Sequence, residues 1–78
     1  MNENTVFSEL WWTVRDYYAP YMTAPEAARK AVKAMADNGH EAIEMGKRFL
    51  MVDGELYEIK KRRDWSHFEL IQHGIRAF

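Results

Sequence analysis

The sequence contains no cysteine, and this absence excludes several kinds of structure and chemistry at once. Without thiols the chain forms no disulfide bonds, holds no thiolate zinc site and has no cysteine nucleophile. It also has little net charge, because eleven Lys and Arg residues face twelve Asp and Glu residues, for a formal charge of −1 at pH 7. Proteins that bind nucleic acid over most of their surface are strongly basic, so the bulk charge argues against that class.

Long hydrophobic runs are missing as well. No apolar stretch approaches the roughly 18 residues that a membrane-spanning helix requires. The first four residues, Met1–Asn4, carry Glu3 and no positive charge, and no apolar segment follows them, so the pattern differs from a secretory signal. We therefore expect a cytoplasmic protein that makes no contact with a membrane.

The residues that are present fit one small globular domain over residues 1–78. The composition is 47% hydrophobic and 29% charged, which is typical of folded rather than disordered chains. A chain of this length buries roughly 60–65% of the surface that its unfolded form exposes. This is enough for one modest core and rarely enough for a deep active-site cavity.

Two helices are predicted in the first half of the chain. Apolar residues at helical spacing predict a helix over residues 5–18, with one stripe formed by Phe7, Leu10, Trp11, Val14 and Tyr18. Pro20 should end this helix, because the residue before a proline avoids the α region. A second helix, over residues 24–38, should begin at a capping box formed by Thr23 and Glu26 and end at Gly39.

The second half of the chain is typical of antiparallel strands. Residues 48–52 and 55–61 flank Asp53 and Gly54, and this dipeptide predicts a hairpin with a type I′ turn. The resulting register places Leu50, Val52, Tyr57 and Ile59 on one face of the hairpin and Phe49, Met51 and Leu56 on the other. Neither face is cleanly polar, so either both faces are partly covered or one is kept for a partner.

A third strand is expected over residues 66–72, with Phe68 and Leu70 on one face. Residues 40–47 are ambiguous, since they fit either a short first strand or a further helical turn. The predicted fold class is therefore α+β, with two N-terminal helices followed by a three-stranded, or four-stranded, antiparallel β-meander.

The sequence lacks the recognised patterns of catalytic and metal sites. The three histidines, His40, His67 and His73, have no metal-ligand spacing, and the last two would lie about 20 Å apart in one strand. Serine elbows and glycine-rich phosphate loops are also missing. We expect no metal, no cofactor and no enzymatic activity. One enzymatic alternative is a small ribonuclease that uses His67, Glu69 and Arg63 on its surface.

A basic run offers a second alternative. Lys60, Lys61, Arg62 and Arg63 precede Trp65, and cations beside an aromatic ring can contact phosphates and stack on bases. Strand alternation would, however, divide these cations between two faces, and edge lysines also prevent aggregation of sheets. In a winged-helix version residues 40–47 would be the recognition helix, but Glu41 and Glu44 would repel phosphates.

The aromatic residues are concentrated near the N-terminus, where residues 7–21 hold six of the eleven in the chain. On a helical wheel Trp12 lies about 140° from Phe7, away from the apolar stripe. Trp12 therefore either packs under the hairpin or a loop, or anchors an interface, as Trp, Tyr and Arg side chains often do. A symmetric dimer would also bury it.

Together these patterns predict a non-enzymatic protein-binding module. In size and in its lack of catalytic motifs, the chain resembles the small accessory proteins of phages and mobile elements that bind a host or defence protein and block it. The mechanism would be steric occlusion of a partner protein, or of a second copy in a homodimer. The expected partner-binding residues are Trp12, Arg15, Tyr17, Arg62, Arg63 and Trp65.

Overall fold

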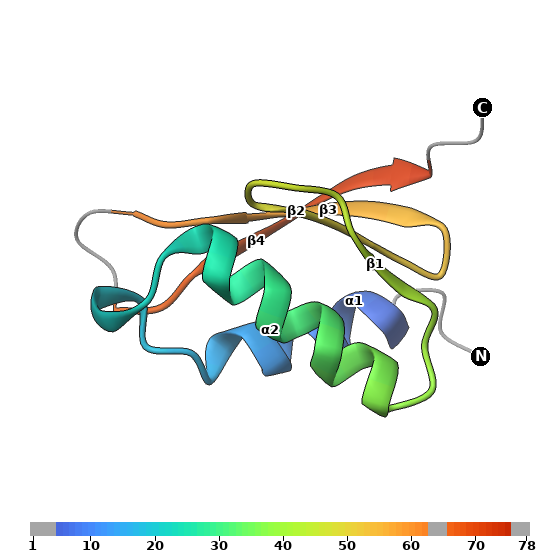
Figure 1. Ribbon diagram of the computed structural model, residues 1–78, viewed down its shortest axis with the longest axis horizontal. Coiled ribbons are helices and arrows are strands. Elements are labelled where there is room, and N and C mark those ends of the chain that lie inside the picture. Colours follow the sequence, from blue (N-terminus) through green and yellow to red (C-terminus); the bar gives the residue numbers. More distant parts are fainter. Residues whose placement is uncertain (1–4, 63–65, 76–78) are drawn as a thin grey trace.

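The computed structural model describes residues 5–62 and 66–75 and contains two helices packed on one side of a sheet (Figure 1). The chain runs in the order α1 (Thr5–Arg15), η1 (Ala19–Tyr21), α2 (Ala24–Asp37), β1 (Ala42–Glu44), β2 (Phe49–Val52), β3 (Glu55–Lys60) and β4 (Glu69–Ile75), where η1 is a single 3₁₀ turn. Within these residues the strands form one antiparallel sheet in the order β1-β2-β3-β4. The predicted α+β class is confirmed, in its four-stranded form.

The β2–β3 hairpin has the register that the sequence predicts. Asp53 and Gly54 have φ angles of 52° and 85°, as the two central residues of a type I′ turn require. Leu50 pairs with Tyr57 and Phe49 pairs with Glu58. The turn chemistry therefore determines which side chains of β2 and β3 face the helices.

The ambiguous segment, residues 40–47, is a strand followed by a turn. Ala42 pairs with Val52 in β2, and positive φ angles at Gly46 and Lys47 reverse the chain before β2 begins. The interpretation of this segment as a recognition helix is therefore wrong. These residues form a strand because the edge of β2 supplies hydrogen-bond partners that an isolated helical turn lacks.

Element ends differ from the predictions where long-range contacts intervene. Helix α1 ends at Arg15 rather than residue 18, because the chain turns to bring Ala19 into the core, where its amide donates to the Ser66 carbonyl. Strand β4 begins at Glu69 rather than residue 66. Helix α2 begins as predicted, with Thr23 Oγ1 accepting a hydrogen bond from the Glu26 amide at 3.2 Å.

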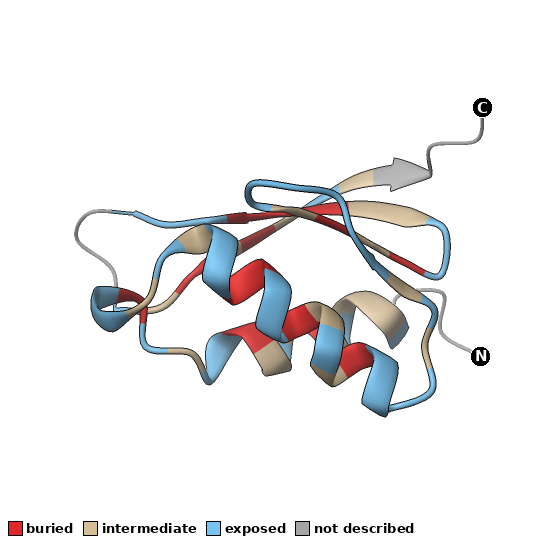
Figure 2. Cartoon of the chain, viewed as in Figure 1, coloured by how far each residue is buried: buried red, intermediate tan, exposed pale blue. Residues whose placement is uncertain are grey.

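The core lies between the helices and the inner face of the sheet (Figure 2). Small residues on α2 allow close approach to the strands, as the sequence stripe indicates. Among the described residues, the fully buried side chains larger than alanine are Leu10, Val14, Met35, Leu50, Val52, Tyr57 and Ile59. None of the described helices is long and apolar enough to cross a membrane.

Neighbouring residues of β2 offer a direct test of this inner face. Leu50 is fully buried and Met51, on the opposite face, is only partly buried. We expect Leu50→Ala to lower the free energy of unfolding by about 2–5 kcal/mol, because it leaves a cavity in the core. Met51→Ala should lower it by less than about half as much. Urea titration of both variants measures the difference, and equal losses would contradict the assigned faces.

Candidate functional site

The most distinctive surface feature is a group of exposed aromatic side chains on α1 and in the turn that follows it. Trp12 is 64% exposed, Tyr18 52% and Tyr21 86%. We call these three residues the aromatic surface. Large rings of this kind are normally mostly buried in a monomer, so the exposure of three of them within ten residues is unusual.

The position of Trp12 on the helix explains its exposure. Leu10 and Val14 face the core, which turns Trp12 outward, while Trp11 remains half-buried against the core. The two indole rings meet edge to face with centroids 5.0 Å apart, and the Arg15 guanidinium lies 4.7 Å from the centre of the Trp11 ring. The alternative that Trp12 packs under the hairpin is therefore wrong.

Tyr17, another predicted binding residue, is partly committed to the fold. It is half-buried and packs against the core, and the Lys30 ammonium lies 5.7 Å from its ring centre. Burial raises the pKa of Tyr17, and the neighbouring Asp16 carboxylate raises it further. Tyr17 therefore contributes less free surface than Tyr18 and Tyr21, whose rings contact each other with centroids 5.0 Å apart.

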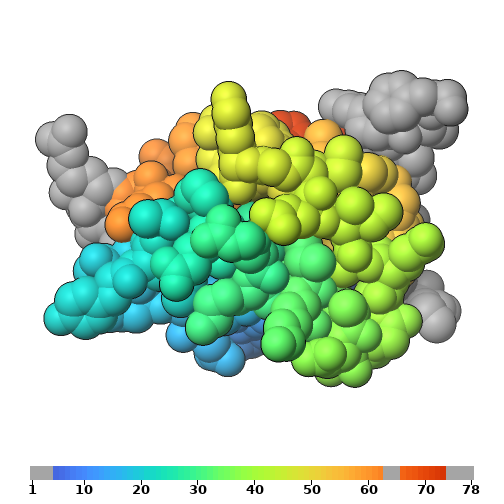
Figure 3. Space-filling model, in the orientation of Figure 1, coloured from blue at the N-terminus to red at the C-terminus, as the bar shows by residue number. Residues whose placement is uncertain are grey.

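The structure brings η1, which ends at Tyr21, next to the basic residues that follow β3. The Lys61 ammonium donates to the Met22 carbonyl at 3.1 Å, directly after η1. In Figure 3 the η1 region, in cyan, projects at one end of the molecule beside the orange end of β3. Tyr18, Tyr21 and Lys61 therefore belong to one end of the fold, a proximity that no local pattern in the sequence shows.

The remaining residues of the basic run have different positions. Arg62 donates from Nε to Glu69 Oε1 at 2.6 Å, and Lys60 is exposed. Arg63 and Trp65 lie outside the described residues. Two of the three described cations thus already hold partners within the chain, and the use of this run to bind nucleic acid stays a prediction.

The structure describes two of the three residues of the ribonuclease alternative, His67 and Glu69, and this alternative stays a prediction. Glu69 is ion-paired with Arg62, His67 is half-buried, and Arg63 lies outside the described residues. Among residues 5–62 and 66–75, no group of three His, Asp or Glu side chains is arranged to hold a metal ion.

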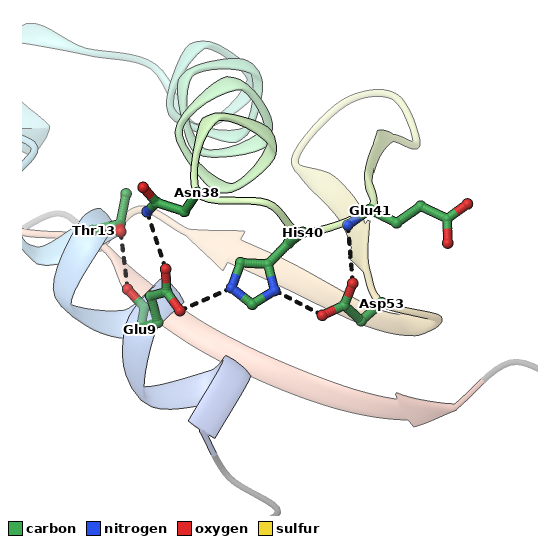
Figure 4. A network of polar contacts seen from close by, with 6 residues as sticks. All are labelled: Glu9, Thr13, Asn38, His40, Glu41 and Asp53. Carbon is green, nitrogen blue, oxygen red and sulfur yellow. Dashed lines mark hydrogen bonds and ion pairs between the residues drawn. The ribbon is translucent and has the colours of Figure 1, made fainter.

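A histidine that the sequence analysis treats as unremarkable lies at the centre of a polar network (Figure 4). His40 Nε2 lies 2.8 Å from Glu9 Oε1, and its Nδ1 lies 2.7 Å from Asp53 Oδ2. Asn38 donates to the other oxygen of Glu9, and the Glu41 amide donates to the other oxygen of Asp53. The network therefore joins α1, the α2–β1 connection and the β2–β3 turn.

The charge state of His40 determines how well this network is satisfied. An imidazolium donates to both carboxylates, whereas a neutral imidazole donates to only one and faces the other with a lone pair. Hydrogen bonds to Asp53 and then to Glu9 accordingly raise the pKa of His40. The same bond from His40, followed by that from the Glu41 amide, lowers the pKa of Asp53.

The sequence does not indicate a second network, which lies on the face of the sheet that points away from the helices. Glu58 accepts from Arg48 Nε at 2.6 Å and contacts His73 Nε2 at 2.9 Å. The Arg48 bond, and then the His73 bond, lower the pKa of Glu58. The hairpin register pairs Phe49 with Glu58, so the nearness of Arg48 could have been found from the sequence. The third member comes from β4, whose register the sequence does not specify.

Comparison of the chain with protein-family models, curated proteins and solved structures gives no match.

The His40 network predicts a pH dependence of stability. The pKa of His40 is higher in the folded state than its ordinary value of 6.5. Protonated His40 therefore stabilises the folded state fully at a pH below 6.5, and this stabilisation is lost as the pH rises through the pKa of the folded state. The pKa of Asp53 is lowered in the folded state, so the Asp53 carboxylate stabilises the folded state at neutral pH and this stabilisation is lost only in acid. Urea midpoints should therefore be lower at about pH 8.5 than at about pH 5.5.

His40→Gln should remove most of this difference, because glutamine carries no titrating proton. His67→Gln, which removes an imidazole outside the network, is the control and should keep the wild-type difference. An unchanged pH profile in His40→Gln would show that the imidazole does not couple these elements.

Proposed function

We propose that this chain is a non-enzymatic protein-binding module that blocks a partner protein by covering part of its surface. The observation that carries this proposal is the aromatic surface, in which Trp12, Tyr18 and Tyr21 all project outside the core. Binding energy at protein interfaces is dominated by a few Trp, Tyr and Arg side chains that fill pockets on the partner. A chain with no enzymatic motif can still inhibit in this way.

The charges around the aromatic surface indicate the kind of partner. Arg15 is exposed one helical turn from Trp12, with the exposed Asp16 next to it, and Lys61 is exposed beside the turn that carries Tyr21. Cations at the edge of an apolar contact favour a partner whose pocket is rimmed by carboxylates. Such charges accelerate encounter and orient the partner, while the rings supply most of the affinity.

The partner can be captured by photo-crosslinking in cells of the source organism. A photoreactive phenylalanine at position 21 should form a covalent adduct with one protein, and the same group at position 43 should not. Ile43 is a fair control because it is 50% exposed and lies on β1, outside the aromatic surface. An adduct of twice the chain mass would identify the partner as a second copy.

Trp12→Ala should then weaken binding of the captured, purified partner by at least about tenfold, since truncation of an interface anchor commonly has this effect. The melting temperature of the Trp12→Ala variant should change little, because the Trp12 side chain lies outside the core. Ile43→Ser should bind like the wild type. Absence of any protein adduct at position 21, or unchanged affinity in Trp12→Ala, would overturn the proposal.

A further inference from the structure

The face of the sheet that points away from the helices holds a second, separate candidate site. We call it the outer face. Its side chains alternate with those of the core, and both described helices lie on the opposite side of the sheet (Figure 1). Apolar and charged residues are mixed there, namely Ile43, Phe49, Met51, Leu56, Glu58, Lys60, Glu69, Ile71 and His73.

Glu58 lies in the middle of this face and is unusually enclosed for a carboxylate. Its side chain is only 10% exposed, whereas those of Arg48 and His73, which it contacts, are partly exposed. One carboxylate oxygen accepts from Arg48 Nε, and the other contacts His73 Nε2. Both oxygens of a buried acid are thus used to hold two basic groups at the surface.

These contacts leave the outer ends of both basic groups available. Arg48 binds Glu58 through Nε, so its two terminal nitrogens take no part in that bond, and His73 uses Nε2, so its Nδ1 takes no part either. The Arg48 guanidinium lies 5.2 Å from the centre of the Phe49 ring, and the His73 ring lies 6.1 Å from it. The Arg48 guanidinium and the rings of Phe49 and His73 therefore place three planar groups close together on this face.

The surrounding charges favour an extended anion. Lys60 lies on the same face, two residues from Glu58 and therefore about 7 Å along β3. Lys47 is exposed in the turn that leads into β2. Each carboxylate of this face is paired with one arginine, Glu58 with Arg48 and Glu69 with Arg62, so Lys60 and Lys47 provide the excess positive charge.

We propose that the outer face binds single-stranded nucleic acid. A backbone phosphate accepts hydrogen bonds from the terminal nitrogens of Arg48, beside the ring of His73. A neighbouring base stacks on the planar groups around Phe49, as bases do on aromatic rings and guanidinium planes. Glu58 is a positioning residue that holds Arg48 and His73 in place and does not touch the ligand.

Substitution of Glu58 distinguishes specific binding at this site from nonspecific attraction between charges. Glu58→Gln removes a negative charge, so nonspecific attraction of a polyanion would become stronger. If Glu58 instead positions Arg48 and His73, its loss should weaken binding. The probes are fluorescein-labelled twelve-nucleotide oligo(U) and oligo(dT), measured by fluorescence anisotropy with the full chain at about 50 mM and about 200 mM salt.

We expect the wild type to bind these oligonucleotides with an affinity that falls as salt rises. Glu58→Gln should bind about fivefold or more weakly, and Glu26→Gln, a matched loss of one exposed carboxylate on α2, should bind equally or more tightly. Arg48→Lys keeps the charge and lacks the planar fork, so it should also bind more weakly. Circular dichroism confirms that each variant is folded.

Several results would overturn the inference: no binding by the wild type at low salt, tighter binding by folded Glu58→Gln, or equal affinity for duplex DNA. Polyglutamate that binds with the same affinity and the same dependence on Glu58 would show that the site takes an acidic peptide instead. Trp12→Ala should bind the oligonucleotides like the wild type, which keeps this test independent of the proposed protein partner.

Discussion

The register of the β2–β3 hairpin is the constraint on which the rest of the structure depends. The two positive φ angles at Asp53 and Gly54 fix the turn, and the turn fixes Leu50 and Tyr57 as core residues. Because side chains alternate along a strand, a slip by one residue would exchange the core face with the outer face. The same turn places the Asp53 carboxylate beside His40, where it helps to attach α1 to the sheet.

The small size of the domain explains why aromatic residues remain outside the core. The two helices cover one face of a four-stranded sheet, and α2 approaches that face closely because Ala27, Ala28 and Ala31 are fully buried there. Leu10 and Val14 occupy the buried side of α1, so Trp12, which lies two residues from each, is turned away from the core. The same arrangement provides no described helix for the other face of the sheet, so the molecule presents two distinct surfaces from one modest core (Figure 2).

Features determined by neighbouring residues could be predicted from the sequence, and features determined by distant ones could not. The hairpin register and the start of α2 at Thr23 follow from local turn and capping chemistry. The early end of α1 depends on the hydrogen bond from Ala19 to Ser66, and the His40 network depends on Glu9, 31 residues away. No local pattern contains these pairings, because they arise only when the helices dock on the sheet.

The two histidine networks differ in what they add to the fold. His40 joins α1 to the α2–β1 connection and the β2–β3 turn, and no β-ladder connects α1 to the sheet, so its bond to Glu9 brings separate elements together. Glu58 joins strands that the ladder already holds in register. Enclosing a carboxylate carries a desolvation penalty that such a pairing offsets only in part. The orientation of Arg48 and His73 at the surface is therefore the main consequence of burying Glu58, and it is this orientation that the proposed nucleic-acid site requires.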